Sequence, residues 1–193
     1  MHWIDPQSLP ETRGVVTRFL LNSHGEIDGL VLGTRRSSQV HCPPHLSSQI
    51  ARNVKLGDTI RVRGVKPRGV DMIAAVSLVT GGGNVILDEG PDHHGQKHQK
   101  PHVEHKPMQV SGEVLLSLHG PKGELRGALL DDGTSLRMPP HAATELVSYL
   151  TPGTHVQAWG HGVANRHGRT MEVEEIAELV EAGSDDSLDT QEL

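Results

Sequence analysis

The chain repeats itself, and this repeat constrains its fold more than any other feature. Gly14, Gly25 and Gly29 recur as glycines 98 residues later. The tripeptide Pro43-Pro44-His45 recurs as Pro139-Pro140-His141, at a shift of 96, so the second copy is two residues shorter in between. Matched glycines together with a matched Pro-Pro-His are a strong sign of duplication. We therefore expect two copies of one small unit.

Each copy is expected to contain five strands and one short helix. Pro43-Pro44 ends the third strand, because proline cannot donate to a ladder and suits the first turn of a helix. Leu46, Ile50 and Val54 follow at four-residue intervals and predict an apolar helix stripe. Residues 59–64 alternate between apolar and polar, as a half-buried strand does. In the first copy the strands are expected at 14–21, 27–32, 39–42, 59–64 and 70–79.

This order of elements is that of the OB-fold, a five-stranded, partly open barrel. Each copy resembles an OB-fold domain, and the whole chain resembles small bacterial proteins with nucleic-acid-binding OB-fold domains. The expected fold class is mainly β, with two OB-fold-like barrels that each carry a short helix between strands 3 and 4. Another small barrel with an inserted helix is the alternative. The predicted units are a first barrel at 11–80, a flexible His-rich linker at 81–107, a second barrel at 108–180 and an acidic disordered tail at 181–193.

The composition agrees with two small aliphatic cores. Hydrophobic residues make up 35% of the 193 residues and aromatic residues only 2%, so one large core is not expected. Cys42 is the only cysteine, which favours a reducing compartment. The N-terminus does not resemble a signal peptide, and no apolar run has the length of a membrane span. We expect a cytoplasmic protein without membrane contact.

The charge is divided unevenly between the copies. Residues 1–80 hold ten Lys and Arg against six Asp and Glu, whereas residues 111–193 hold five against fourteen. OB-folds commonly bind oligonucleotides or oligosaccharides through strands 2–3 and the loops after strands 1 and 4. A basic groove along the phosphates supplies most of the affinity for single strands. The candidate nucleic-acid-binding residues are Arg35, Arg36, Arg61, Arg63, Lys66 and Arg68 in the first copy, and Trp159, Arg166 and Arg169 in the second.

The scarcity of aromatic residues argues for weak binding. Strands 2 and 3 of both copies contain none, and their outward positions are expected to be Gln39 and His41 in the first copy and Ser135 and Arg137 in the second. Trp159 could stack a base, or it could cover a barrel end or pack on the other copy. We predict weak binding of single-stranded DNA or RNA through the basic first copy. The alternatives are that the cations are ordinary solvated turn charges, or that the barrels form a protein-interaction or structural adaptor.

A third function to consider is metal binding. The linker carries five histidines, His93, His94, His98, His102 and His105. Imidazoles suit zinc, copper or nickel, but the irregular spacing predicts at most a loosely bound zinc or nickel ion. The shared Pro-Pro-His is either an anion site at a helix start or a stiff corner between strand and helix. No motif of a nucleophile elbow, phosphate loop or metalloprotease helix is present, so an enzyme is not expected.

Overall fold

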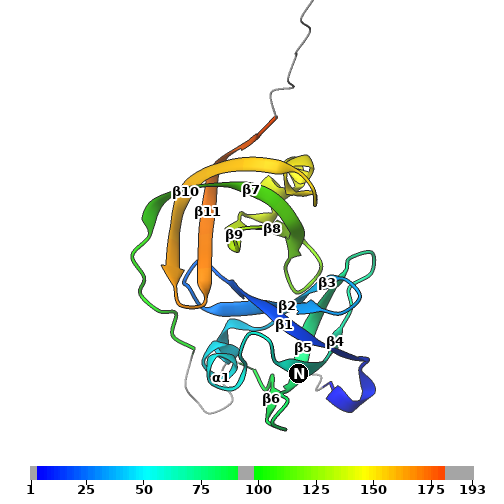
Figure 1. Cartoon of the computed structure of the whole chain (residues 1–193). Coiled ribbons are helices and arrows are strands. Elements are labelled where there is room, and N and C mark those ends of the chain that lie inside the picture. The colour runs from blue at the N-terminus through cyan, green and yellow to red at the C-terminus, as the bar shows by residue number, and fades with distance from the viewer. Residues whose placement is uncertain (1–3, 91–97, 181–193) are drawn as a thin grey trace, which may run out of the picture.

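Two five-stranded barrels make up the chain (Figure 1). The computed structural model describes residues 4–90 and 98–180. The first barrel contains β1 (Glu11–Leu21), β2 (Ile27–Gly33), β3 (Ser37–His41), β4 (Thr59–Val65) and β5 (Met72–Val79). The second contains β7 (Lys106–His119), β8 (Leu125–Leu130), β9 (Thr134–Arg137), β10 (His155–Asn165) and β11 (Gly168–Glu178).

The strand pairing is the same in both barrels. The first strand pairs antiparallel with the second and the fourth, and the third pairs parallel with the fifth, which closes the barrel. The antiparallel pairs β2–β3 and β8–β9, and β4–β5 and β10–β11, complete each ring. This topology is that of the OB-fold, so the predicted fold class and the tandem arrangement are confirmed.

The helical segments lie between the third and fourth strand of each barrel. In the first barrel η2 (Pro44–Leu46) leads into α1 (Ser47–Asn53), and in the second α2 (Pro140–Glu145) leads into η3 (Val147–Leu150). Pro43 and Pro139 have extended backbones, and the proline that follows each of them starts the helix. A further turn, η1 (Pro6–Ser8), precedes β1. Within 4–90 and 98–180, no helix has both the length and the apolar character needed to cross a membrane.

Each barrel has its own aliphatic core. In the first barrel Leu30, Ile60 and Leu78 are fully or almost fully buried, and Ile50 packs against them from α1. The second core is smaller and includes Leu136, Val156 and Met171. Two cores of this kind agree with the low apolar content of the chain.

A pair of matched glycines permits a bulge in the fourth strand of each barrel. The register shifts between Arg63 and Gly64 in β4, and between Trp159 and Gly160 in β10. A Cβ atom on Gly64 would lie 2.2 Å from the carbonyl oxygen of Ala74, and one on Gly160 would lie 1.9 Å from that of Glu172. Only glycine allows so close an approach of two strands at a bulge.

The segment predicted as a linker contributes to the first barrel. β6 (Val85–Leu87) pairs antiparallel with β5, and Ile86 is buried in the first core. Farther along, Nε2 of His98 lies 2.7 Å from a carboxylate oxygen of Glu26. Nε2 of His105 lies 2.6 Å from the carbonyl oxygen of Ser23. The first unit thus extends to at least Leu87, and part of the following segment lies against the first barrel.

Candidate nucleic-acid interface and the seam between the barrels

The two barrels dock through equivalent positions of the repeat. Leu20 and Val31 of the first barrel form one buried cluster with Leu118 and Leu129 of the second. Leu118 is the repeat equivalent of Leu20, and Leu129 is that of Val31, each at the shift of 98. The same patch of both copies therefore meets itself, as in the isologous interface of a twofold dimer. We call this interface the seam.

Polar contacts surround the apolar centre of the seam. The side chain of Gln39 donates to the carbonyl oxygen of His119 at 2.9 Å and accepts from its amide at 2.8 Å. Arg137 donates to Asp28 at 2.9 Å in an ion pair whose side chains are 14% and 11% exposed. Asn165 donates to the carbonyl oxygen of Gly25 at 2.8 Å. These bonds fix the register of the two barrels.

The seam occupies the surface on which OB-folds commonly bind ligands. Gln39 and Ser135, expected to face solvent from the third strands, are only 2% and 1% exposed. The face of β2 and β3 therefore contacts the second barrel instead of water. A polyanion therefore cannot lie along this face while the barrels stay docked.

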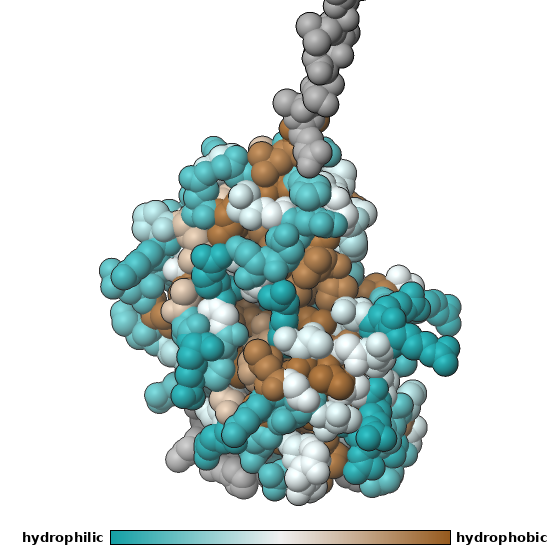
Figure 2. All heavy atoms as spheres, in the orientation of Figure 1, coloured by the Kyte–Doolittle hydropathy of each residue, from teal (hydrophilic) through white to brown (hydrophobic). Residues whose placement is uncertain are grey.

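Three neighbouring loops form a cationic region that we call the basic end: the β2–β3 loop (34–36), the β4–β5 loop (66–71) and the β7–β8 turn (120–124). Arg36 lies 3.9 Å from Asp71, which joins the first two loops. The β7–β8 turn of the second barrel lies against the β4–β5 loop, since a Cβ atom added to Gly123 would lie 3.0 Å from Cβ of Pro67. The loops lie on one side of the molecule (Figure 1), and hydrophilic side chains project there (Figure 2).

The basic end carries four cations that form no ion pair within the described part of the chain: Arg35, Lys66, Arg68 and Lys122. All four residues are exposed. Lys122 was not among the residues predicted from the sequence. The available signal was its place in the loop after the first strand of the second copy, one of the two loops that the OB-fold resemblance implicates.

The predicted arginines of β4 lie on the outer wall of the first barrel. Arg61 is exposed and stands opposite Arg13 of β1 in the register. Arg13 was also not predicted, and the two like charges make a small cationic patch. Arg63 has a different surrounding: it lies 3.1 Å from Glu11 and donates to the carbonyl oxygen of Leu9 at 2.9 Å. Its charge is therefore neutralised, and it holds the segment before β1 in place.

The predicted residues of the second copy lie away from the basic end. Arg166 is exposed in the β10–β11 turn, next to the residue that contacts Gly25 of the first barrel. Arg169 forms an ion pair with Asp132. Trp159 is half-buried on the outside of β10 and stands opposite Glu175 of β11. Glu174 and His161 line the hollow that also contains the indole, so two carboxylates, Glu174 and Glu175, lie on this wall.

The described histidines of the predicted metal site lie in different surroundings and do not converge. His93 and His94 lie outside the described residues. His98 and His105 contact the first barrel as described above, and His102 is exposed. Within 4–90 and 98–180, no group of three or more His, Cys, Asp or Glu side chains can hold a metal ion. His45 of the Pro-Pro-His motif lies 2.8 Å from Asp88, and this contact ties the helix start to the segment after β6.

Three histidines at the seam have lowered pKa values. Burial lowers the pKa of His41 below its usual 6.5. The carboxylates of Asp28 and Glu124 raise this pKa, and the guanidinium groups of Arg137 and Arg126 lower it. Burial also lowers the pKa of His119, against the effect of Glu124. For His167, which meets the ring of Phe19 edge-on, burial and Arg166 both lower the pKa.

Acid is therefore expected to weaken the docked state. Between the lowered pKa values and 6.5, the unfolded chain binds protons that the native chain does not, so stability falls as pH falls below about 6.5. Each pKa unit of difference is worth about 1.4 kcal/mol. Urea unfolding between pH 7.5 and 5 should show this slope, and His119→Gln should reduce it. A stability that stays constant over this range would contradict the expectation.

Comparison with known proteins adds little to this description. No protein-family model and no curated protein sequence matches the chain. Two crystal structures of the single-stranded DNA binding protein from Thermus aquaticus, a deletion mutant and the wild type, align at 13% and 12% identity. The alignments cover 91% and 88% of this chain and 96% and 91% of those chains, each with a TM-score of 0.27. The OB-fold assignment rests on the strand topology, not on these alignments.

Proposed function

We propose that the chain binds single-stranded nucleic acid at the basic end. The observation that carries this proposal is the set of four exposed, unpaired cations on three adjacent loops from both barrels. Phosphates are the ligand that such a set fits best, because neutralising them releases counterions. Arg61 and Arg13 extend the cationic path along the wall of β4.

The same features set the strength of binding. Four phosphate contacts correspond to a slope of roughly −3 in a plot of log affinity against log salt for a single strand. The basic end contains no aromatic side chain, so it lacks the stacking that adds about 1–3 kcal/mol per base in other single-strand binders. Binding is therefore weak, salt-dependent and tolerant of sequence, with DNA and RNA both as ligands.

A charge reversal in the β4–β5 loop tests this function. The double variant Lys66→Glu/Arg68→Glu should lose at least about tenfold in affinity for a labelled oligonucleotide at low salt, and its salt slope should shrink by about 1.4. The measurement is fluorescence anisotropy with single-stranded DNA and RNA between about 25 and 200 mM salt. This range spans the roughly 0.1 M at which the Debye length is about 10 Å.

The matched control is Arg52→Glu/Lys55→Glu, which makes the same change of charge at exposed positions near the end of α1. This variant should bind almost as the parent does. Equal losses in both double variants would show that only net charge matters, and would overturn the assignment to the basic end. An absence of binding by the parent at low salt would remove nucleic acid as the ligand.

A further inference from the structure

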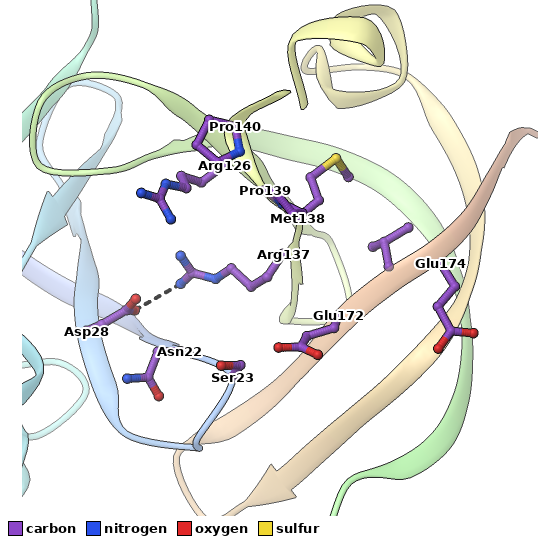
Figure 3. A pocket seen from close by; sticks show the side chains of 11 residues that line it. Asn22, Ser23, Asp28, Arg126, Arg137, Met138, Pro139, Pro140, Glu172 and Glu174 are labelled. Atoms are coloured by element: carbon purple, nitrogen blue, oxygen red, sulfur yellow. Dashed lines mark hydrogen bonds and ion pairs between the residues drawn. The ribbon is translucent and has the colours of Figure 1, made fainter. Parts of the chain in front are cut away.

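The seam contains a pocket that the basic end does not use. It has a volume of about 530 Å³ and lies between the β1–β2 turn of the first barrel and strands β8, β9 and β11 of the second (Figure 3). Pockets that bind small molecules have volumes of about 300–1,000 Å³ and are often found between domains. The docking of the barrels thus creates a site of ligand size that neither barrel has alone.

The pocket has one apolar side and one polar side. Pro139 and Pro140 supply apolar surface, and Met138, which is mostly buried in the second core, contributes only an edge. Arg126 and Arg137 extend into the space beside the prolines, and the carboxylate of Glu172 lies on the far side of Arg137 (Figure 3). The lining therefore combines a surface for a flat ring with hydrogen-bond donors and an acceptor for its edge.

The polar groups retain hydrogen-bonding capacity. Arg137 uses Nη2 for Asp28, and its Nε is buried without a hydrogen-bond partner in the described structure. Among the residues that the structure describes, Arg126 pairs with Glu124 alone, at 3.1 Å, and its side chain is 46% exposed. Glu172 makes no ion pair or side-chain hydrogen bond with the residues that the structure describes. Polar groups in a pocket that lack hydrogen-bond partners favour a ligand that supplies those partners.

We infer that this pocket binds a single nucleobase and prefers guanine. An isolated phosphate does not fit, because Asp28, Glu172 and Glu174 bring carboxylates to the lining. An aliphatic ligand would leave the arginines and Glu172 unpaired, which is costly. Guanine presents acceptors at O6 and N7, which arginine pairs with, and donors at N1 and N2 for a carboxylate. Its flat face suits the two prolines.

The base can come from a free guanine nucleoside or from a strand. The inference does not rest on binding at the basic end, because none of the four cations Arg35, Lys66, Arg68 and Lys122 lines the pocket. The two sites approach each other only at the β7–β8 turn, where Glu124 pairs with Arg126. The two sites can therefore be tested separately on the full chain.

Calorimetry with nucleosides tests the pocket. Guanosine should bind at sub-millimolar concentration, and adenosine, cytidine and uridine at least about tenfold more weakly, since one good bidentate pair discriminates by that much or more. Guanosine monophosphate should bind as guanosine does. Binding of ribose phosphate as tight as that of guanosine monophosphate would mean phosphate recognition and would overturn the inference, as would no heat with guanosine.

Two exposed lining residues supply the variants. Glu172→Gln and Arg126→Gln should each weaken guanosine about tenfold, whereas Glu145→Gln and Arg166→Gln, also exposed but outside the pocket, should not. Equal affinity in all four variants would place guanosine elsewhere and overturn the inference. Lys66→Glu/Arg68→Glu should retain guanosine binding whether or not it loses the oligonucleotide.

A competition experiment identifies the source of the base. An oligothymidine strand with one guanine should lose affinity when guanosine is added, and a strand of thymidine alone should not, if the pocket takes its base from a strand. Guanosine binding without such competition identifies a free nucleoside as the occupant. Both results support a base-specific pocket, and competition against both strands alike would overturn it.

Discussion

The variant Arg137→Ala is expected to lose about 3–5 kcal/mol of stability, because removing one partner of a buried ion pair leaves the other charge without compensation. Asp28, whose side chain is 11% exposed in the parent, would be left in the seam with no cation bonded to it. Each barrel keeps its own core, so the loss should appear as separation of the barrels before either one unfolds. Small-angle scattering and chemical denaturation would measure the separation and the free energy.

The loss should also depend on pH in a definite direction. Burial raises the pKa of Asp28 above 3.8, and Arg137 and His41 oppose this rise. Without Arg137 the pKa rises further. Between 3.8 and the raised value the native state holds a proton that the unfolded state has released, so stability falls as pH rises through that window. The Arg137→Ala variant should therefore be closest to the parent near pH 4 and farthest from it at neutral pH.

A double variant separates the ion pair from simple packing. Asp28→Leu/Arg137→Met replaces both charges by apolar groups, and such replacements of buried pairs are often neutral or stabilising. It should recover most of the stability lost by Arg137→Ala. If the double variant is as unstable as the single one, the seam depends on the shape of the arginine and not on its charge.

The fold could be predicted from the sequence because its signals are local. The matched Pro-Pro dipeptides stop the third strands, and Gly64 and Gly160 are at equivalent bulges. The alternation of 59–64 predicted β4 to within one residue of its end. Such signals act on neighbouring residues, so a pattern along one chain reveals them.

The seam could not be predicted in the same way, because it joins residues far apart in sequence. Gln39 and His119 are 80 residues apart, and Asp28 and Arg137 are 109 apart. A polar residue at an outward strand position predicts solvent, yet Gln39 is buried by a partner surface. One usable signal was the unbroken apolar run from Leu30 to Leu32 in β2, and in the structure all six residues from Ile27 to Leu32 are buried. A strand of this kind needs a covering layer on each side.

Only the part of the candidate site that lies within one loop could be predicted from the sequence. Lys66 and Arg68 belong to one loop, and the sequence places them together. Lys122 lies near these two residues only because the barrels dock. Arg63 is not available to a phosphate, because its guanidinium group already binds Glu11 and the carbonyl oxygen of Leu9. Composition predicts that a region is basic, but only the docked structure shows which charges are free.

Gly127→Ala is the second substitution with a large expected effect. Gly127 stands in β8 opposite Arg137 of β9, with φ at 154°. A Cβ atom there would lie 1.8 Å from the carbonyl oxygen of Leu136. Overpacking costs about 1–3 kcal/mol and backbone strain about 1–3 kcal/mol more, so we expect a loss of roughly 4 kcal/mol from the second barrel, or at least about 10 °C in its melting temperature.

Gly153→Ala is the matched control, because Gly153 has φ at 91° but nothing within 4 Å of an added Cβ. It should cost only the backbone strain, about 1–3 kcal/mol. In a Trp3→Phe background the one remaining tryptophan is Trp159 of β10, so its fluorescence reports the second barrel. Equal melting temperatures for the two variants would show that β8 and β9 separate without cost.

The same variant connects stability to function. Gly127 holds together the two strands that carry Arg126 and Arg137, so Gly127→Ala should abolish guanosine binding as the second barrel loosens. The first barrel keeps its own core and its own cations at the basic end, and only Lys122 is lost from that set. Oligonucleotide binding should therefore weaken only severalfold, by about one phosphate contact. Complete loss of oligonucleotide binding would instead mean that the strand needs both barrels docked.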